Sequence, residues 1–175
     1  KTALQHLRLL IQTEAVDATV ELTAYTGVAA FNIGFGAKTA CSAFRIYPNA
    51  KFVKELKGDR CKELERQWSN VCLLIVDEIS FIGKAFFYRM HLRLQQAKRG
   101  YYAQGGLDPD AHSFGDVSMI LVGDFGQLEP IEDLSFCDDE TTYRTCPKSL
   151  WNLWPHIRGG ADLVRDVEKI RGGGD

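Results

Sequence analysis

The chain has 175 residues, of which 45% are hydrophobic and 25% are charged. This is the composition of about one globular domain, and it excludes disordered, collagen-like and coiled-coil proteins. The longest uncharged apolar stretch, residues 71–76, is far shorter than the roughly 20 residues that cross a bilayer, so we expect a soluble protein without a membrane partner.

The net charge of −2 argues against a surface that is basic throughout and encloses nucleic acid. The charges are nevertheless segregated. Residues 38–66 carry eight basic and four acidic side chains, residues 84–99 carry five basic and no acidic ones, and residues 108–140 carry ten acidic side chains and no Lys or Arg. Two interpretations stay open, namely one face that meets phosphates and solvated helix faces that happen to be basic.

The five cysteines form an odd set without a C-x-x-C pair. This favours free thiols in a reduced intracellular compartment over a disulfide framework. Cys137, Cys146 and His156 are a weak candidate for a metal site, because a clear fourth ligand is missing.

The first part of the chain predicts alternating helix and strand. Residues 3–13 place leucines at helical spacing and predict a short helix, and residues 20–25 (VELTAY) predict a strand. Residues 26–36 begin with a turn signal and end in two glycines, which predicts a loop, a short helix and a second loop. Residues 50–68 have a rough helical register that a Gly-Asp pair at 58–59 interrupts.

Two continuous apolar runs, residues 71–76 (VCLLIV) and 117–122 (VSMILV), predict strands that are buried on both faces. A helix over 82–98 and a flexible connection over 100–115 join them, and the remainder is loop-rich with a short helix near 161–170. This alternation predicts an α/β fold with a parallel sheet, whose ligand crevice lies at the carboxyl ends of the strands.

Acidic residues follow the first apolar run at this edge. A buried strand that delivers Asp77 and Glu78 is the Walker B arrangement, in which the first acid holds Mg²⁺ and the second takes a proton from an attacking water. The alternative is that the two acids cap the next helix beside Ser80, since acids favour helix starts.

The second apolar run ends in a similar way. Gly123 permits a sharp turn, Asp124 lies at the strand tip, and the Gln127 amide follows where it can bond a γ-phosphate oxygen and the attacking water. At the other end of the chain, Lys1 and Thr2 directly precede a predicted helix, as the last two letters of the phosphate loop G-x-x-x-x-G-K-[ST] do. In this interpretation the glycine loop and its preceding strand lie upstream.

Three segments resemble motifs Ia, II and III of the Pif1-like DNA helicases, in the RecD-like branch of superfamily one. They read TAYTGVAAFNIGFGAKTACSAFRI, LLIVDEISFIGKAFF and ILVGDFGQLEPI, and the resemblance covers residues 1–131 in the family's order. It implies a RecA-like P-loop motor domain, lacking its first strand and phosphate loop, that hydrolyses ATP with Mg²⁺ and moves 5′ to 3′ on single-stranded DNA. It also implies a nuclear or mitochondrial location in a eukaryote, with roles in DNA repair, recombination and telomere maintenance.

The resemblance assigns roles to individual residues. Lys1 would contact the β- and γ-phosphates, Thr2 and Asp77 the magnesium ion, Glu78 would activate water, and Gln127 would sense the γ-phosphate.

The implied DNA contacts are Thr26, Gly27, Val28 and neighbouring residues of the same loop, whose hydroxyl and small side chains let a phosphodiester approach. Phe31 or Phe44 would stack a base, although each is more often a core residue.

The chain departs from the family pattern at Tyr25, Cys41 and Glu129, where proline, histidine and proline are usual. We expect a partial motor domain over residues 1–135 and a loop-rich tail over 136–175. No clear arginine motif follows residue 131. The resemblance implies that activity needs a second RecA-like domain. Two other functions stay open: an inactive remnant that only binds nucleic acid, and a different P-loop ATPase.

Overall fold

The computed structural model describes residues 19–47, 54–108, 111–126, 128–131 and 133–136. Several predicted features lie outside these residues. They are the helices over 3–13 and 161–170, nearly all of the tail over 136–175, and the residues Lys1, Thr2, Gln127, Cys137, Cys146 and His156.

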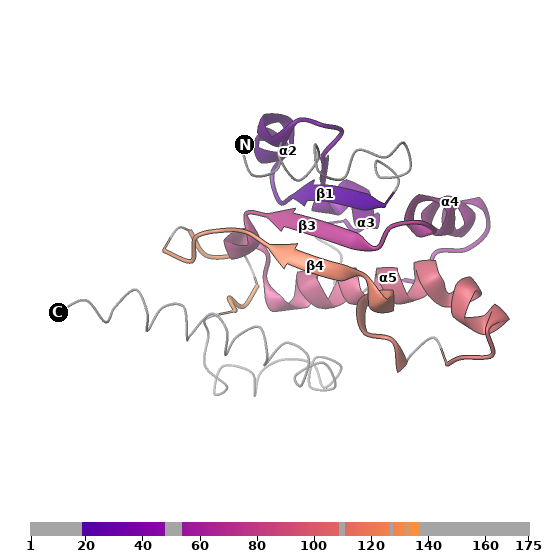
Figure 1. The fold of residues 1–175 in the computed structure, drawn as a ribbon. Helices are drawn as coiled ribbons and strands as arrows, with labels where there is room; N and C mark the ends of the chain where they lie inside the picture. The colour runs from indigo at the N-terminus through magenta and orange to yellow at the C-terminus, as the bar shows by residue number, and fades with distance from the viewer. Residues whose placement is uncertain (1–18, 48–53, 109–110, 127, 132, 137–175) are drawn as a thin grey trace.

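The core of the fold is a parallel sheet in the order β2-β1-β3-β4, which confirms the predicted fold class. Its strands are β1 (Val20–Ala24), β2 (Lys38–Thr39), β3 (Leu73–Asp77) and β4 (Ser118–Leu121). Figure 1 shows β1, β3 and β4 side by side, with their carboxyl ends at the same edge. The register pairs Ala24 with Asp77, so both residues belong to the same face of the sheet.

Helices cover both faces of this sheet. The larger core joins the sheet to α3 (Ala40–Phe44), α4 (Asp59–Trp68) and α5 (Lys84–Gln104), and a smaller cluster joins Ala24 to α2 (Gly27–Ile33). Such two-sided cover explains why β3 is an unbroken apolar run. Among the described residues, no helix has the length and apolar character that crossing a membrane requires.

Most elements lie where the sequence predicts them, with three differences. Helix α4 begins at Asp59, after Gly58 with φ 59°, so the glycine starts the helix and does not interrupt one. Helix α5 continues through Gly100 to Gln104, and residues 113–116 form a 3-10 turn, so the flexible connection predicted over 100–115 is partly wrong. The short α3 and β2 were not predicted, because two to five residues carry too little periodicity.

The prediction that the second apolar run is a buried strand is wrong. In this run, Ile120, Leu121 and Val122 are 41–46% exposed. The physical reason is position: within the described residues, β4 pairs with β3 alone and is therefore an edge strand.

Candidate functional site

The carboxyl edge of the sheet brings together segments that are distant in sequence. Strand β3 ends at Asp77, whose Oδ1 accepts a hydrogen bond from the Glu78 backbone N–H at 2.9 Å. The backbone N–H of Ile79 then donates to the carbonyl of Val122 at 3.0 Å, which ties the end of β4 to the segment after the two acids.

Glu78 is held in an unusual conformation. Its backbone is left-handed, with φ 56° and ψ 42°, which is costly for a residue with a side chain. Its carboxylate Oε2 accepts two hydrogen bonds from Thr26, one from the hydroxyl at 2.8 Å and one from the backbone N–H at 3.2 Å. The Glu78 side chain makes no capping bond to the 3-10 helix Ile79–Phe81, and the Asp77 carboxylate accepts the N–H of Glu78, which precedes that helix. The helix-cap interpretation of these acids is therefore wrong.

Thr26 has a structural role that the sequence only partly indicates. It is the N-cap of α2, and its hydroxyl oxygen accepts from the Ala29 backbone N–H at 3.2 Å. A threonine before a run of small residues is a recognisable cap signal. The bond to Glu78 spans 52 residues and no local pattern predicts it.

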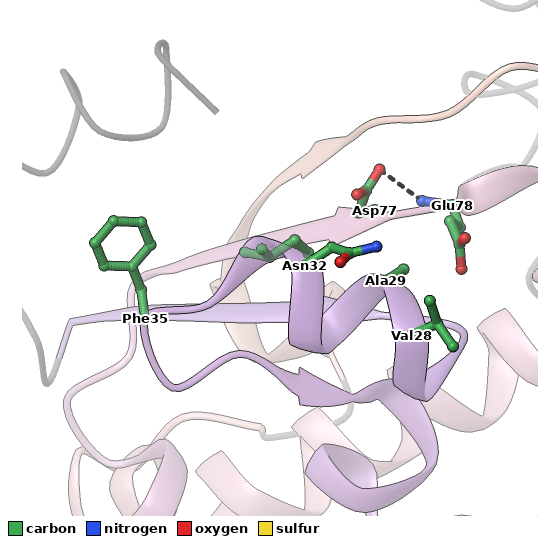
Figure 2. A pocket seen from close by; sticks show the side chains of 7 residues that line it. Val28, Ala29, Asn32, Phe35, Asp77 and Glu78 are labelled. Carbon is green, nitrogen blue, oxygen red and sulfur yellow. Dashed lines mark hydrogen bonds between the residues drawn. The ribbon is translucent and has the colours of Figure 1, made fainter.

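A pocket of about 350 Å³ lies between α2 and the end of β3. Figure 2 shows its lining: Val28, Ala29 and Asn32 from α2, Phe35 beyond the helix, and Asp77 and Glu78 at the sheet edge. The Asp77 and Glu78 carboxylates point in different directions, and that of Glu78 points toward the α2 end that carries Val28. The α2 side of the pocket is thus apolar apart from the Asn32 amide, and the β3 end is acidic.

The candidate DNA contacts on α2 are accessible. Val28 is 72% exposed and Phe31 is 86% exposed, and no atom lies within 4 Å of a Cβ built at Gly27. Phe44 is different, because it is fully buried and stacks on Trp68 at a centroid distance of 5.0 Å. Phe44 is a core residue, so the expectation that it stacks a base is wrong, and Phe31 is left as the aromatic candidate.

The turn after β4 is shaped by a close backbone approach. A Cβ at Gly123 would lie 2.9 Å from the backbone nitrogen of Ile79. The exposed Asp124 accepts the Gly126 backbone N–H at 2.9 Å. Asp124 therefore closes the turn that leads to residue 127, while Gln127 lies outside the described residues.

The positions that depart from the family pattern have different surroundings. Tyr25 stacks on Phe81 with ring centroids 6.1 Å apart, and burial raises its pKa above the ordinary value. Burial likewise raises the pKa of the half-buried Cys41 thiol. Glu129 is exposed.

Several basic side chains are already paired. Lys38 bonds Glu21 at 2.8 Å, and Arg45 bonds Glu63 at 2.8 Å. Arg99 pairs with Glu55, and this contact lowers the pKa of the Glu55 carboxyl. These pairs reduce the positive charge of the basic segments and favour the interpretation of solvated helix faces.

Asp133 is a residue that sequence reasoning missed. Its carboxylate accepts the backbone N–H groups of Ala85 and Phe86, at 3.1 and 3.0 Å, and so caps α5 from 48 residues away. The sequence signal that could have indicated it is a missing cap. Gly83 precedes α5 and has no side chain to cap the helix, so an acceptor from a distant segment is needed.

Comparisons with known proteins identify the family of this chain. The family model described as PIF1-like helicase matches residues 1–158. The ATP-dependent DNA helicase PIF1 of Xenopus laevis is 32% identical over 134 residues, which is 71% of this chain and 18% of the relative. The ATP-dependent DNA helicase RRM3 of Saccharomyces cerevisiae is 26% identical over 136 residues, which is 73% of this chain and 17% of the relative.

Solved structures agree with these matches. The Bacteroides Pif1 helicase in complex with ADP-AlF3 and ssDNA superposes with a TM-score of 0.50 at 26% identity, over 73% of this chain and 27% of that one. The Candida albicans Pif1 helicase gives a TM-score of 0.51 at 25% identity, over 77% of this chain and 28% of that one. This chain spans less than a fifth of these curated relatives. The family match over most of its length shows that the chain belongs to the PIF1-like helicases.

Proposed function

We propose that this chain is part of the first RecA-like motor domain of an ATP-dependent helicase that moves 5′ to 3′ on single-stranded DNA. The observation that carries the proposal is the sheet edge, where Asp77 and Glu78 lie beside Thr26 and the Gly123 turn in a chain of this family. The Bacteroides relative was crystallised with a nucleotide analogue and ssDNA, which supports both ligand classes.

Asp77 suits a magnesium ion that is bound together with a nucleotide. Mg²⁺ in such sites takes one or two carboxylates and completes its shell with phosphate oxygens and waters. The donor set fits this pattern, because β3 ends in one carboxylate, that of Asp77, at the edge of the sheet. The bound nucleotide with its Mg²⁺ would supply a polarised γ-phosphate.

The chain's own residues would then position water and phosphate. Glu78 would accept a proton from the attacking water, and Gln127 would orient that water against the γ-phosphate. Lys1 and Thr2 would hold the phosphates and the magnesium ion. Positioning and charge neutralisation supply nearly all the catalysis in this class of reaction.

The exposed side of α2 would contact the DNA. Thr26, Gly27 and Val28 would touch the backbone, and Phe31 would stack a base. Residues 1–135 would form the motor portion and 136–175 a tail, and a second RecA-like domain would be needed to close over ATP. The nuclear or mitochondrial location and the roles in repair, recombination and telomere maintenance stay predictions.

The test is ATP hydrolysis by the full-length protein with Mg²⁺, with and without a single-stranded oligonucleotide. We expect at least about tenfold stimulation by DNA, the equivalent of about 1.4 kcal/mol in the barrier. Hydrolysis that is indifferent to DNA would indicate a different P-loop ATPase, and DNA binding without hydrolysis would indicate an inactive remnant.

The DNA surface is tested by Phe31→Ala. Base stacking on an aromatic side chain contributes about 1–3 kcal/mol, so the Kd for the oligonucleotide should rise about 5-fold to 150-fold. Tyr101→Ala is the matched control, because Tyr101 is also a well-exposed aromatic residue, at 73%, but lies near the far end of α5. Equal losses in the two variants would remove Phe31 from the proposed interface.

A further inference from the structure

The contact between Thr26 and Glu78 joins the two halves of the proposed machinery. Glu78 Oε2 accepts both the hydroxyl and the backbone N–H of Thr26, and no ion pair to Glu78 is present within the described residues. Thr26 is also the residue from which α2 begins, and α2 carries the exposed Val28 and Phe31. The proposed base and the proposed DNA surface are therefore one hydrogen bond apart.

The Thr26 hydroxyl has a single proton to donate. In this structure that proton goes to Glu78, while the hydroxyl oxygen accepts from the Ala29 N–H. A DNA phosphate is only an acceptor, so it requires a donor from Thr26. The hydroxyl proton can go to Glu78 or to a phosphate but not to both, and the two contacts compete.

The orientation of Glu78 makes this competition matter. Its carboxylate points toward the Val28 end of α2, whereas the Asp77 carboxylate points elsewhere (Figure 2). A water that attacks a phosphate near Asp77 needs a base directed at the same place. The oxygen Oε2 already accepts two bonds, and the left-handed backbone of Glu78 stores strain that those bonds help to hold.

We infer that Thr26 is a positioning residue that holds Glu78 away from its working orientation until single-stranded DNA takes over the Thr26 donors. The inference rests on the proposed function of the sheet edge. DNA stimulation of ATP hydrolysis then has a local cause. The Thr26 hydroxyl donates its hydrogen bond to the DNA phosphate and no longer to Glu78, and the Glu78 carboxylate turns toward the attacking water.

The main test is Thr26→Val in the full-length protein. The variant keeps the shape and the backbone N–H but loses the hydroxyl bond to Glu78. We expect the DNA-free kcat to rise about tenfold, the equivalent of about 1.4 kcal/mol, while the KM for ATP is unchanged and the ratio of DNA-stimulated to DNA-free rate approaches one. Thr26→Ser retains the hydroxyl and should restore the ratio.

Loss of the helix cap is controlled by Thr39→Val. Thr39 is the N-cap of α3 and accepts the Ser42 N–H at 3.2 Å, which is the same cap chemistry without the Glu78 contact. This control should keep the wild-type ratio. Thr26→Asp is a second variant that preserves a capping acceptor but repels Glu78, so it should also raise the DNA-free rate.

A binding measurement tests the same competition without hydrolysis. Glu78→Ala frees the Thr26 donors, whereas Glu78→Gln removes the same charge but keeps an acceptor oxygen. We expect Glu78→Ala to bind the oligonucleotide several-fold more tightly than Glu78→Gln, because coupling between two contacts is reciprocal.

The outcomes separate this inference from the function on which it rests. A full-length wild-type protein without DNA-stimulated hydrolysis overturns the proposed function. If DNA stimulates hydrolysis by the wild type, two results for Thr26→Val would overturn the inference alone. One is an unchanged ratio of DNA-stimulated to DNA-free rate, and the other is an equal loss of both rates.

Discussion

Replacement of Asp133 by Ala should loosen the start of α5, the longest helix of the fold. The Asp133 carboxylate accepts the N–H groups of Ala85, Phe86 and Leu134, at 3.1, 3.0 and 2.8 Å. It also lies so close to Gly83 that a Cβ there would be 2.2 Å from Asp133 Cγ. The contact is therefore tight and comes from outside the helix.

The size of the effect follows from these contacts. Loss of a helix N-cap costs about 0.5–2 kcal/mol, and loss of a negative charge at a helix N-terminus costs about 0.3–1 kcal/mol. Added together, the two effects give about 1–3 kcal/mol for the opening of the first turns. Each 1.4 kcal/mol is a factor of ten in an equilibrium constant, so amide exchange should accelerate about 5-fold to 150-fold.

The measurement is hydrogen exchange followed by mass spectrometry on the full-length protein, over the amides of residues 87–92. These amides lie one turn inside α5 and are not themselves bonded to Asp133. Asp133→Asn keeps one acceptor oxygen and should give an intermediate rate. Asp59→Ala removes an exposed acid from the first turn of α4 and should leave α5 exchange unchanged. Wild-type exchange over 87–92 in Asp133→Ala would refute the capping argument.

Three further predictions concern the sheet edge, the base and a buried tyrosine. Gly123→Ala should lower the free energy of unfolding by about 1–3 kcal/mol, because the new Cβ clashes with the Ile79 backbone. Gly100→Ala lies in open space inside α5 and should raise the free energy of unfolding by about 0.5–1 kcal/mol. Urea denaturation measures both variants. Glu78→Gln should abolish ATP turnover and retain nucleotide binding, because it removes the proton acceptor. If the variant hydrolysed ATP at the wild-type rate, another residue would have to be the base. Burial and then the Asp116 carboxylate raise the pKa of Tyr102 from 10.0 to about 12, so this group's contribution to stability is full below pH 10 and is lost as pH rises toward about 12. Burial also raises the pKa of Tyr25 and Tyr88, so ultraviolet titration of Tyr102→Phe should show one late-ionising phenol fewer than the wild type, and an unchanged titration would contradict the assignment.

The strand β3 and its acidic end could be predicted from the sequence because their signals are local. An unbroken apolar run of strand length that stops at two acids indicates a central parallel strand and its carboxyl edge. The short helix α2 was likewise predicted, and its end at Gly34 fits a φ of 71° that a glycine adopts readily.

What the sequence did not predict depends on distant partners. The bond between Thr26 and Glu78 spans 52 residues, and the Asp133 cap of α5 spans 48. Gly100 signals a helix end by propensity, yet α5 continues through it because the packing of the helix outweighs about 1 kcal/mol of propensity. The exposure of β4 depends on its place in the sheet order, which hydrophobicity alone does not indicate.

Because the backbone of Glu78 is left-handed, substitutions at this position that raise stability should lower activity. Glycine, asparagine and aspartate adopt φ near 56° more cheaply than glutamate does, so a procedure that optimises thermal tolerance would select them there. Each of them shortens or deletes the side chain that reaches Thr26. A screen for heat-resistant variants should therefore enrich substitutions at residue 78 that unfold later and no longer turn over ATP.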